Sequence, residues 1–355
     1  MVKKAGLLVF SLLFALFGLE LVLRLVPPRE PTPDADRSPM FYDRAEARAH
    51  PWTLGASNVL RIAVIGDSFT VGVGVQTDDT YGARLERLLN FNAGSVPAEV
   101  RVYAHPGTST FQQKPLLQAA LAQKPAIVIQ GICLNDFEDW SHPKKIQRWR
   151  AEWMHEPSPF QLFCVRHSRV AAFIGERVWA ARSPQRCETY YRHLYDPNGA
   201  GALRFKNTIE VFRDACAANG AVFVPVVFPL LSFDFSPERY PMSFAHDAIR
   251  RICDECGVPC LDLLPAFRGT SPERMQAVPG VDPHPSEIAH HIAAESILAH
   301  LLERGLVDES YRLTGRKDDL FIHAVWKKTL HHVRFQPDEQ APAENNAIPD
   351  PGKTE

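Results

Sequence analysis

The segment Leu60-Arg61-Ile62-Ala63-Val64-Ile65-Gly66-Asp67-Ser68-Phe69 is a short apolar run that ends in a Gly-Asp-Ser turn. A continuous apolar run of this length is typical of a strand buried on both faces of a parallel sheet. Open α/β folds place their chemistry at the carboxyl ends of such strands, which makes Ser68 a candidate nucleophile. The alternative is a Gly-Asp turn in which Ser68 only caps a helix.

Short apolar strands and helices alternate along the chain after this segment. The pattern predicts an α/β fold, a three-layer αβα sandwich around a flavodoxin-like, five-stranded parallel sheet. The strands are expected at residues 61–65, 100–103, 126–132, 221–228 and 258–263. The helices are expected at residues 80–89, 111–122, 203–218, 244–253 and 286–302. The order of the strands in the sheet does not follow from the sequence.

The composition indicates one folded domain, which we expect at residues 59–305. The chain has 355 residues, of which 45% are hydrophobic and 23% charged, so it can bury one substantial core. A formal net charge of -2 argues against a nucleic-acid-binding protein, because such proteins need a basic face. Residues 27–58 are expected to form a linker stalk, and the extension 306–355 is expected to be disordered from about residue 336.

The amino terminus is apolar and mostly uncharged over residues 5–26. A helix of this length has the roughly 20 residues needed to cross a bilayer, so we expect a single-pass membrane anchor, with a cleaved signal peptide as the alternative. Lys3 and Lys4 precede it, which predicts a cytoplasmic amino terminus and a folded domain on the periplasmic or extracytoplasmic side of the inner (plasma) membrane. Glu20 and Arg24 are four residues apart and are expected to pair.

Residues 136–202 separate the third and fourth expected strands. They form an insertion that is not needed to build the core. One amphipathic helix is expected at residues 168–181. Insertions of this length are often lids or binding elements, and the alternative is a helical pad that only covers the sheet. The insertion contains four tryptophans, Trp140, Trp149, Trp153 and Trp179.

The seven cysteines are an odd number, so at least one is expected to be free or to pair outside the chain. Cys253, Cys256 and Cys260 are spaced in a way that superficially suggests a metal or redox site. No second ligand pair at zinc-finger spacing accompanies them, so we expect buried thiols or a disulfide and no metal site. The sequence does not say which cysteines pair.

A serine nucleophile needs a base within hydrogen-bond reach and a group that orients the base. The segment Val281-Asp282-Pro283-His284-Pro285-Ser286 follows the last expected strand and precedes the last expected helix. Two prolines restrict the backbone around His284, so we expect it at the same sheet edge as Ser68, with Asp282 as the acceptor for its second ring nitrogen. In the alternative, Asp282 and Ser286 are turn and helix-cap residues, and His284 is a surface residue without a catalytic role.

Acyl transfer also needs hydrogen-bond donors for the developing oxyanion. Gly107 follows the second expected strand and offers a backbone N–H, and Asn135 follows the third and offers an amide. Each has a structural alternative, as a turn glycine or a helix-capping residue. Parallel strands end at one edge of a sheet, so a single pocket could collect all of these groups.

The order of these motifs resembles the SGNH, or GDSL-type, hydrolase family. Its blocks are a Gly-Asp-Ser, a Gly after the second strand, an Asn after the third and a late Asp/His pair. The resemblance covers residues 60–302 apart from the insertion and implies a flavodoxin-like sandwich. It implies the nucleophile Ser68, the base His284, the orienting acid Asp282, and an oxyanion hole from Ser68, Gly107 and Asn135.

Three departures from the common family pattern are visible. No Asn precedes Gly107, three residues rather than one separate Gly131 from Asn135, and Asp282 and His284 are separated by one residue rather than two. Membrane-anchored bacterial members are similar in having Asn-Asp-x-x-Asp, here residues 135–139, and an Asp-x-His-Pro ending. We therefore interpret the departures as subfamily variation.

These observations predict a membrane-anchored serine ester hydrolase. Its expected substrate is an acyl or acetyl ester of a carbohydrate or lipid, with a polysaccharide as one candidate partner. No cofactor or metal ion is expected, because the sequence has no complete dinucleotide-binding glycine motif, no Gly-Lys-Ser/Thr phosphate loop and no His-Glu-x-x-His motif. The net charge argues against a nucleic-acid partner. The alternatives are an O-acyltransferase that modifies an exported polysaccharide and a non-catalytic polysaccharide-binding or assembly subunit.

Overall fold

The computed structural model describes residues 2–25, 58–91, 96–138, 159–258, 260–280 and 282–313. The chain divides into two compact units, 1–314 and 315–355, and every described residue belongs to the first. The expected stalk, apart from residue 58, and the expected disordered tail lie outside the described residues. So do three tryptophans of the insertion, Trp140, Trp149 and Trp153.

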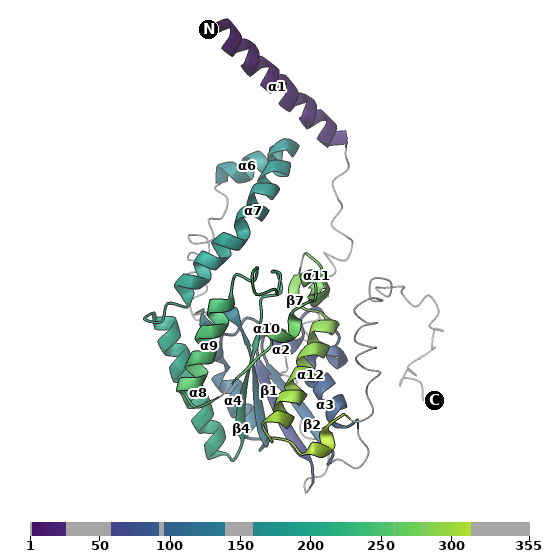
Figure 1. Cartoon of the computed structure of the whole chain (residues 1–355), viewed down its shortest axis with the longest axis vertical. Helices are drawn as coiled ribbons and strands as arrows, with labels where there is room; N and C mark the ends of the chain where they lie inside the picture. Colours follow the sequence, from purple (N-terminus) through teal and green to yellow (C-terminus); the bar gives the residue numbers. More distant parts are fainter. Residues whose placement is uncertain are drawn as a thin grey trace, which may run out of the picture. The chain divides into compact units, whose positions relative to one another are not determined.

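Five parallel strands form the central sheet in the order β2-β1-β3-β4-β5 (Figure 1). Their bounds are β1 (Leu60–Gly66), β2 (Ala98–Ala104), β3 (Ile127–Cys133), β4 (Val222–Phe228) and β5 (Leu261–Asp262). This is the flavodoxin-like order, in which the strand order reverses between β1 and β3. The predicted α/β fold with a five-stranded parallel sheet is confirmed.

The two innermost strands carry the most continuous apolar sequence. Every residue of β3 is buried, as are residues 62–66 of β1. Because helices cover both faces, neither strand needs the polar alternation of a half-exposed strand. The polar side chain in β3, Gln130, donates to the Gln113 amide oxygen (2.9 Å).

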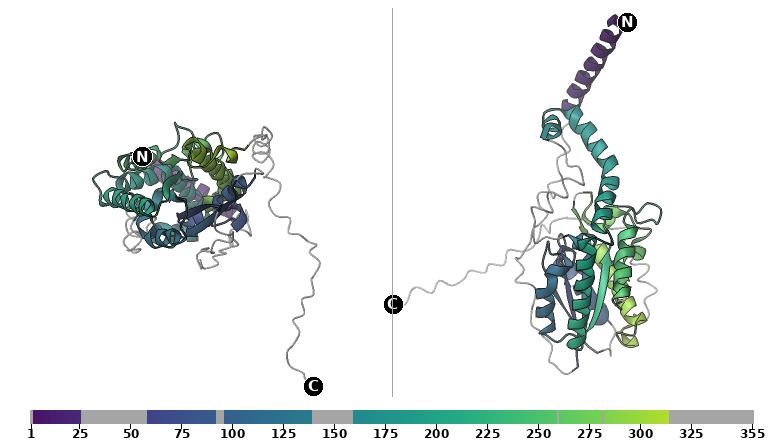
Figure 2. Two further views of the ribbon diagram at one scale, coloured as in Figure 1. Left: turned by 90° about the horizontal axis from the view of Figure 1, so that it is seen from below. Right: turned by 90° about the vertical axis from the view of Figure 1, so that its left-hand side faces the viewer.

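Two groups of helices cover the sheet (Figures 1 and 2). On one face α3 (Tyr81–Leu89) packs on α12 (Glu287–Glu303), and the Tyr81 N–H donates to His290 Nδ1 (3.1 Å). On the other face α8 contacts both α4 and α9. The bounds of this second group are α4 (Lys114–Leu121), α8 (Ala200–Ala218) and α9 (Ser243–Glu255).

In its described residues from 159 onward, the insertion contains two helices where one was expected. These are α6 (Pro159–His167) and α7 (Arg169–Leu194), which is longer than the predicted 168–181. The Ser168 hydroxyl accepts from the Ala171 N–H (3.1 Å) and caps α7. Before it, the Ser168 N–H donates to the Cys164 carbonyl (2.9 Å), so Ser168 closes one helix and opens the next.

The last part of the domain differs from the expected strand and loop. The predicted strand 258–263 is reduced to the two residues of β5, because Gly257 (φ 67°) ends α9 in a turn that the Val258 N–H closes on the Cys253 carbonyl. Residues 282–285, expected in a loop, form β7 (Asp282–Pro285), which pairs antiparallel with β6 (Gln276–Val278). The short helices α10 (Leu264–Phe267) and α11 (Pro272–Met275) lie between β5 and β6.

The amino-terminal helix forms as expected, but its predicted role in a membrane is not confirmed. Helix α1 spans Val2–Leu25, and Arg24 Nε lies 2.8 Å from Glu20 Oε1, so the predicted ion pair is present. Among the described helices, none combines the length and the apolar character needed to span a membrane.

The cysteines at positions 133, 164, 216, 253, 256 and 260 are free thiols in the structure. Two of them are neighbours, because the Cys253 and Cys260 side chains share a hydrogen bond. The described residues contain no group of three or more His, Cys, Asp or Glu side chains that could hold a metal ion. Of the three closely spaced cysteines, Cys253 and Cys256 are buried and Cys260 is half-buried.

Replacing Gly131 by alanine is expected to destabilise the sheet. A Cβ there would lie 2.6 Å from the Tyr81 hydroxyl and 2.5 Å from Thr70 Oγ1, two buried atoms that are hydrogen-bonded to each other (2.9 Å). We expect a loss of about 1–3 kcal/mol in the free energy of unfolding, measured in urea. Gly201→Ala is the control, because its added methyl would approach other atoms no closer than 3.3 Å. An unchanged midpoint for Gly131→Ala would contradict this packing.

Candidate active site

Ser68 is the first residue of the short helix α2 (Ser68–Val71), directly after β1. The Asp67 carboxylate accepts from the Phe69 N–H (3.0 Å) and holds the start of this helix. Gly72 ends it with φ 80°, a conformation that favours glycine. Asp67 and Phe69 are buried, whereas Ser68 is half-buried. The hydroxyl-bearing residue is therefore the accessible one of the three.

Asp282 and His284 lie on β7, in the hairpin that the sequence did not predict. Side chains two apart on a strand share a face, which explains why a spacing of one residue between them suits this site. The Nδ1 atom of His284 lies 2.6 Å from Asp282 Oδ1, and the His284 backbone N–H donates to the same oxygen (3.0 Å). The carboxylate therefore fixes the ring and favours the tautomer with its proton on Nδ1.

The His284 ring lies beside the start of α2. It meets the Phe69 ring edge to face, with 5.6 Å between the ring centroids. On the other side of Ser68 in the sequence, the Asp67 carboxylate interacts with the charge of His284. The hairpin thus packs the imidazole against the residue that follows Ser68 in the sequence.

Gly107 lies in the turn that follows β2, at the same edge of the sheet. The turn is tied to β1 because the His105 N–H donates to the Gly66 carbonyl (3.1 Å). The Thr108 hydroxyl closes it on the His105 carbonyl (2.7 Å). Gly107 has φ 71°, and a Cβ there would meet no atom within 4 Å. Its backbone therefore borders open space near the end of β1.

Asn135 lies in the turn η3 (Leu134–Phe137), directly after β3. Its amide oxygen is buried and has no hydrogen-bond partner within the described residues. Buried polar atoms without a partner are uncommon in native proteins. Rotation about the last side-chain bond exchanges the oxygen and NH2 ends, so this amide can turn a donor toward a bound oxygen.

Two buried carboxyl groups, Asp67 and Asp136, are adjacent in the sequence to Ser68 and Asn135. The sequence analysis gave neither of them a role. Burial raises the pKa of Asp67 to about 6, although the Phe69 N–H and the charge of His284 act against this. Burial also raises the pKa of Asp136 well above its usual value, and the nearby Asp67 charge adds to the effect. The Thr110 hydroxyl donates to Asp136 Oδ2 (3.0 Å). The proximity of the two carboxyls opposes simultaneous ionisation of both.

Gln276 braces the hairpin that carries His284, and its sequence context gave no signal of this. Its amide NH2 donates to the Leu231 carbonyl (2.7 Å), in the segment after β4. Its amide oxygen accepts from the Gly280 N–H (2.6 Å), in the turn between β6 and β7. Gly74 borders the other side, since a Cβ there would lie 3.6 Å from Asp282 Oδ2. The hairpin is thus held from two directions.

The carboxyl-terminal end of α7 packs on the Asn135 turn. The Tyr195 hydroxyl donates to the Leu134 carbonyl (2.8 Å), and the Tyr190 hydroxyl donates to Glu138. Tyr190, Tyr195 and Glu138 are all buried. This end of the insertion therefore supports the turn that holds Asn135, which the sequence alone did not indicate.

The raised pKa of Asp67 predicts a stability that depends on pH. Its pKa is higher in the folded chain than the ordinary value near 3.8, so the folded state binds this proton more tightly. The free energy of unfolding therefore falls as pH rises from about 4 to about 6.5, by on the order of 2–3 kcal/mol. Urea titrations across this range should show a smaller fall for Asp67→Asn. The exposed Asp78→Asn is the control, and a fall of equal size in all three proteins would contradict the assignment.

Comparison with known proteins places these features in one family. Residues 64–292, more than half of the chain, match the GDSL-like lipase/acylhydrolase family. No curated protein matches the chain. The match spans the α2 turn, Gly107, Asn135 and the hairpin with Asp282 and His284.

Several solved structures are similar over about two thirds of the chain. They include the acetylxylan esterase Axe2 from Geobacillus stearothermophilus (17% identity, 70% of this chain and 96% of that chain, TM-score 0.42). Others are LAE5, an α/β hydrolase enzyme from the metagenome of Lake Arreo, Spain (16%, 69% and 95%, 0.43), and TesA (17%, 68% and 97%, 0.41). The family match carries the assignment: the chain belongs to the GDSL-like lipase/acylhydrolase family.

Proposed function

We propose that the protein is a serine ester hydrolase that removes an acyl or acetyl group from a carbohydrate or lipid ester. The single observation that carries the proposal is the 2.6 Å contact between His284 Nδ1 and Asp282 Oδ1, beside the helix that begins at Ser68. An Asp-bound Nδ1–H leaves Nε2 of the same ring as a base. Family membership supports the choice of an ester bond.

In the proposed reaction His284 Nε2 takes the Ser68 proton while Ser68 Oγ attacks the ester carbonyl carbon. The tetrahedral intermediate then breaks its bond to the alcohol, which leaves with the proton from His284. Water attacks the acyl-enzyme, and His284 takes one proton of this water. Ser68 Oγ leaves with that proton, and the acyl group departs as the free acid. The steps use only side chains of this chain and water.

The oxyanion is proposed to bind between three donors. These are the backbone N–H groups of Ser68 and Gly107 and the amide of Asn135. The Gly107 turn supports this role because it is hydrogen-bonded to Gly66. Asn135 supports it because its amide oxygen is buried without a partner among the described residues, so that rotation of the amide can turn its NH2 donor toward a substrate oxygen. Each such donor contributes roughly 10²–10³ to the rate in characterised enzymes.

The predicted location on the outer side of the inner membrane remains part of the proposal. It is supported by Lys3 and Lys4 ahead of the apolar run, and it would expose the enzyme to esters of surface carbohydrates and lipids.

Ser68→Ala should abolish labelling by a fluorophosphonate probe, because the probe phosphonylates only an activated serine oxygen. The measurement is gel fluorescence and intact mass of the full chain. Ser232→Ala, at an exposed serine, is the control and should label like the wild type. Equal labelling of Ser68→Ala and the wild type would sink the nucleophile assignment. Transfer of the acyl group to an added sugar, rather than its release as free acid, would instead identify an O-acyltransferase.

Asp282→Asn should reduce kcat/KM by about 10²–10⁴, because the amide oxygen still accepts the His284 backbone N–H but no longer supplies a negative charge to the ring. The activity is measured with a soluble p-nitrophenyl ester. Asp262→Asn is a geometrically matched control, because Asp262 Oδ1 lies 2.8 Å from Nδ1 of a second histidine, the buried His246. Similar kcat/KM losses in both variants would mean that the Asp282 pair has no special part in the reaction.

A further inference from the structure

The hairpin of α6 and α7 exposes large apolar side chains at its α6 end. Phe160 and Phe163 on α6 are 74% and 59% exposed, and Phe173, Ile174 and Val178 on α7 are 39%, 50% and 44% exposed. The two helices pack together, so these residues share one region of the surface. We call these five residues the hairpin tip. Soluble domains seldom expose apolar groups of this size together without a partner.

Basic side chains accompany the hairpin tip. Arg166, Arg169 and Arg177 are exposed, and the Arg177 guanidinium carbon lies 3.3 Å from the centroid of the Phe173 ring. Residues 159–182 contain four arginines, at 166, 169, 177 and 182, and one acidic residue, Glu176. Exposed aromatic residues beside arginines are typical of helices that lie in the headgroup region of an anionic bilayer.

Helix α1 is bonded to the same end of the hairpin. The Glu20 carboxylate accepts from the Ser168 hydroxyl (2.9 Å) and from the N–H groups of Arg169 (3.1 Å) and Val170 (2.9 Å), at the start of α7. Arg24 donates to the His167 carbonyl (3.3 Å), at the end of α6.

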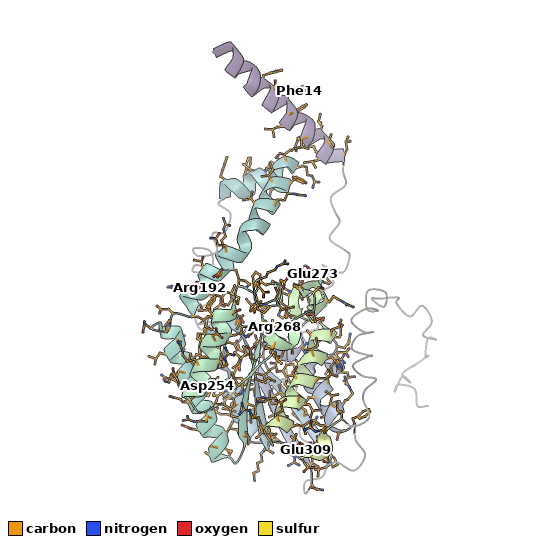
Figure 3. All side chains as sticks on the ribbon, viewed as in Figure 1. Phe14, Arg192, Asp254, Arg268, Glu273 and Glu309 are labelled. Carbon is orange, nitrogen blue, oxygen red and sulfur yellow. The ribbon has the colours of Figure 1, made fainter. Side chains whose placement is uncertain are left out.

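The exposed face of α1 adds to the apolar surface. Phe10, Phe14 and Phe17 are 66%, 70% and 62% exposed, and Figure 3 shows Phe14 on this helix. Because α1 is hydrogen-bonded to the start of α7, the phenylalanines of α1 and the hairpin tip can contact the same apolar environment.

Helix α7 connects the hairpin tip to the candidate active site. Its 26 residues correspond to about 39 Å along the axis. Its amino-terminal half carries part of the tip, and at its other end Tyr190 and Tyr195 are bonded to Glu138 and Leu134, on either side of Asn135. The tip and the turn that holds Asn135 therefore lie at opposite ends of one helix.

We propose that the hairpin tip is a membrane-surface contact that inserts its phenylalanines into the headgroup region of a bilayer rich in anionic phospholipid. The arginines meet the lipid phosphates, and the phenylalanines replace contact with water by contact with acyl chains. A bilayer is favoured over a protein partner because it offers anionic and apolar groups over the whole width of α1 and the hairpin. The proposal concerns binding and stands whether or not Ser68 is a nucleophile.

Hydroxyl-radical footprinting of the full chain tests this contact, because oxidation of each phenylalanine reports the exposure of that side chain alone. The chain is compared in buffer, with phosphatidylcholine vesicles, and with vesicles containing about 30 mol% phosphatidylglycerol. We expect oxidation of Phe160, Phe163 and Phe173 to fall at least threefold with the anionic vesicles. Phe91, which is 56% exposed at the end of α3, is the internal control and should not change.

A charge-reversed variant tests the arginines. Arg166→Glu/Arg177→Glu should lose most of the protection of Phe160 and Phe163, whereas Arg239→Glu, at a side chain 76% exposed elsewhere on the domain, should keep it. Protection confined to Phe10, Phe14 and Phe17 would overturn the proposal, since the vesicle would then contact α1 alone. Protection of the tip in buffer that rises with protein concentration would also overturn it and would assign the face to a second copy of the chain.

Discussion

The parallel pairing of β1 between β2 and β3 is the constraint on which the site depends. Gly66 pairs with Ala104 at the end of β1 and β2, and a Cβ on Gly66 would lie 3.1 Å from the Gly131 carbonyl of β3. Three chain segments therefore leave the sheet at one edge, toward Ser68, Gly107 and Asn135. The His105 N–H then extends the pairing by one further bond to Gly66. The relative positions of these groups follow from backbone geometry before any side chain contributes.

The base reaches this edge by a different route, because His284 belongs to no strand of the parallel sheet. The β6-β7 hairpin carries it, and the hairpin is short and has its own register irregularity. Its position therefore rests on side-chain bonds, chiefly the two that Gln276 makes to Leu231 and Gly280. Asp282 adds two contacts within the hairpin, since one of its oxygens lies at hydrogen-bond distance from the His284 ring and also accepts the His284 backbone N–H. Local turn geometry and imidazole orientation are thus set by one carboxylate.

The sequence predicted the parts of this molecule that depend on local pattern and could not predict those that depend on distant partners. Apolar runs predicted all five strands, and they placed Ser68, Gly107 and Asn135 after the ends of β1, β2 and β3, where the structure has them. The predicted strand 258–263 is too long, because Val258 belongs to the turn that ends α9 and the strand is only Leu261–Asp262. The hairpin was missed because Asp-Pro-His-Pro has no strand-like pattern. The contact of Glu20 with α7 was invisible, since its partners lie 148–150 residues away.

The buried carboxyls show how the fold's interior bears on its chemistry. Asp67 is needed to begin α2, because its oxygen accepts from the Phe69 N–H, yet the same burial that orders this turn disfavours its charge. A positive charge on His284 favours the ionised form of Asp67. The proposed reaction places a positive charge on the His284 ring each time Ser68 gives up its proton, so in that proposal the ionisation of Asp67 responds to the state of the base. The nearby Asp136 limits how readily Asp67 and Asp136 ionise together.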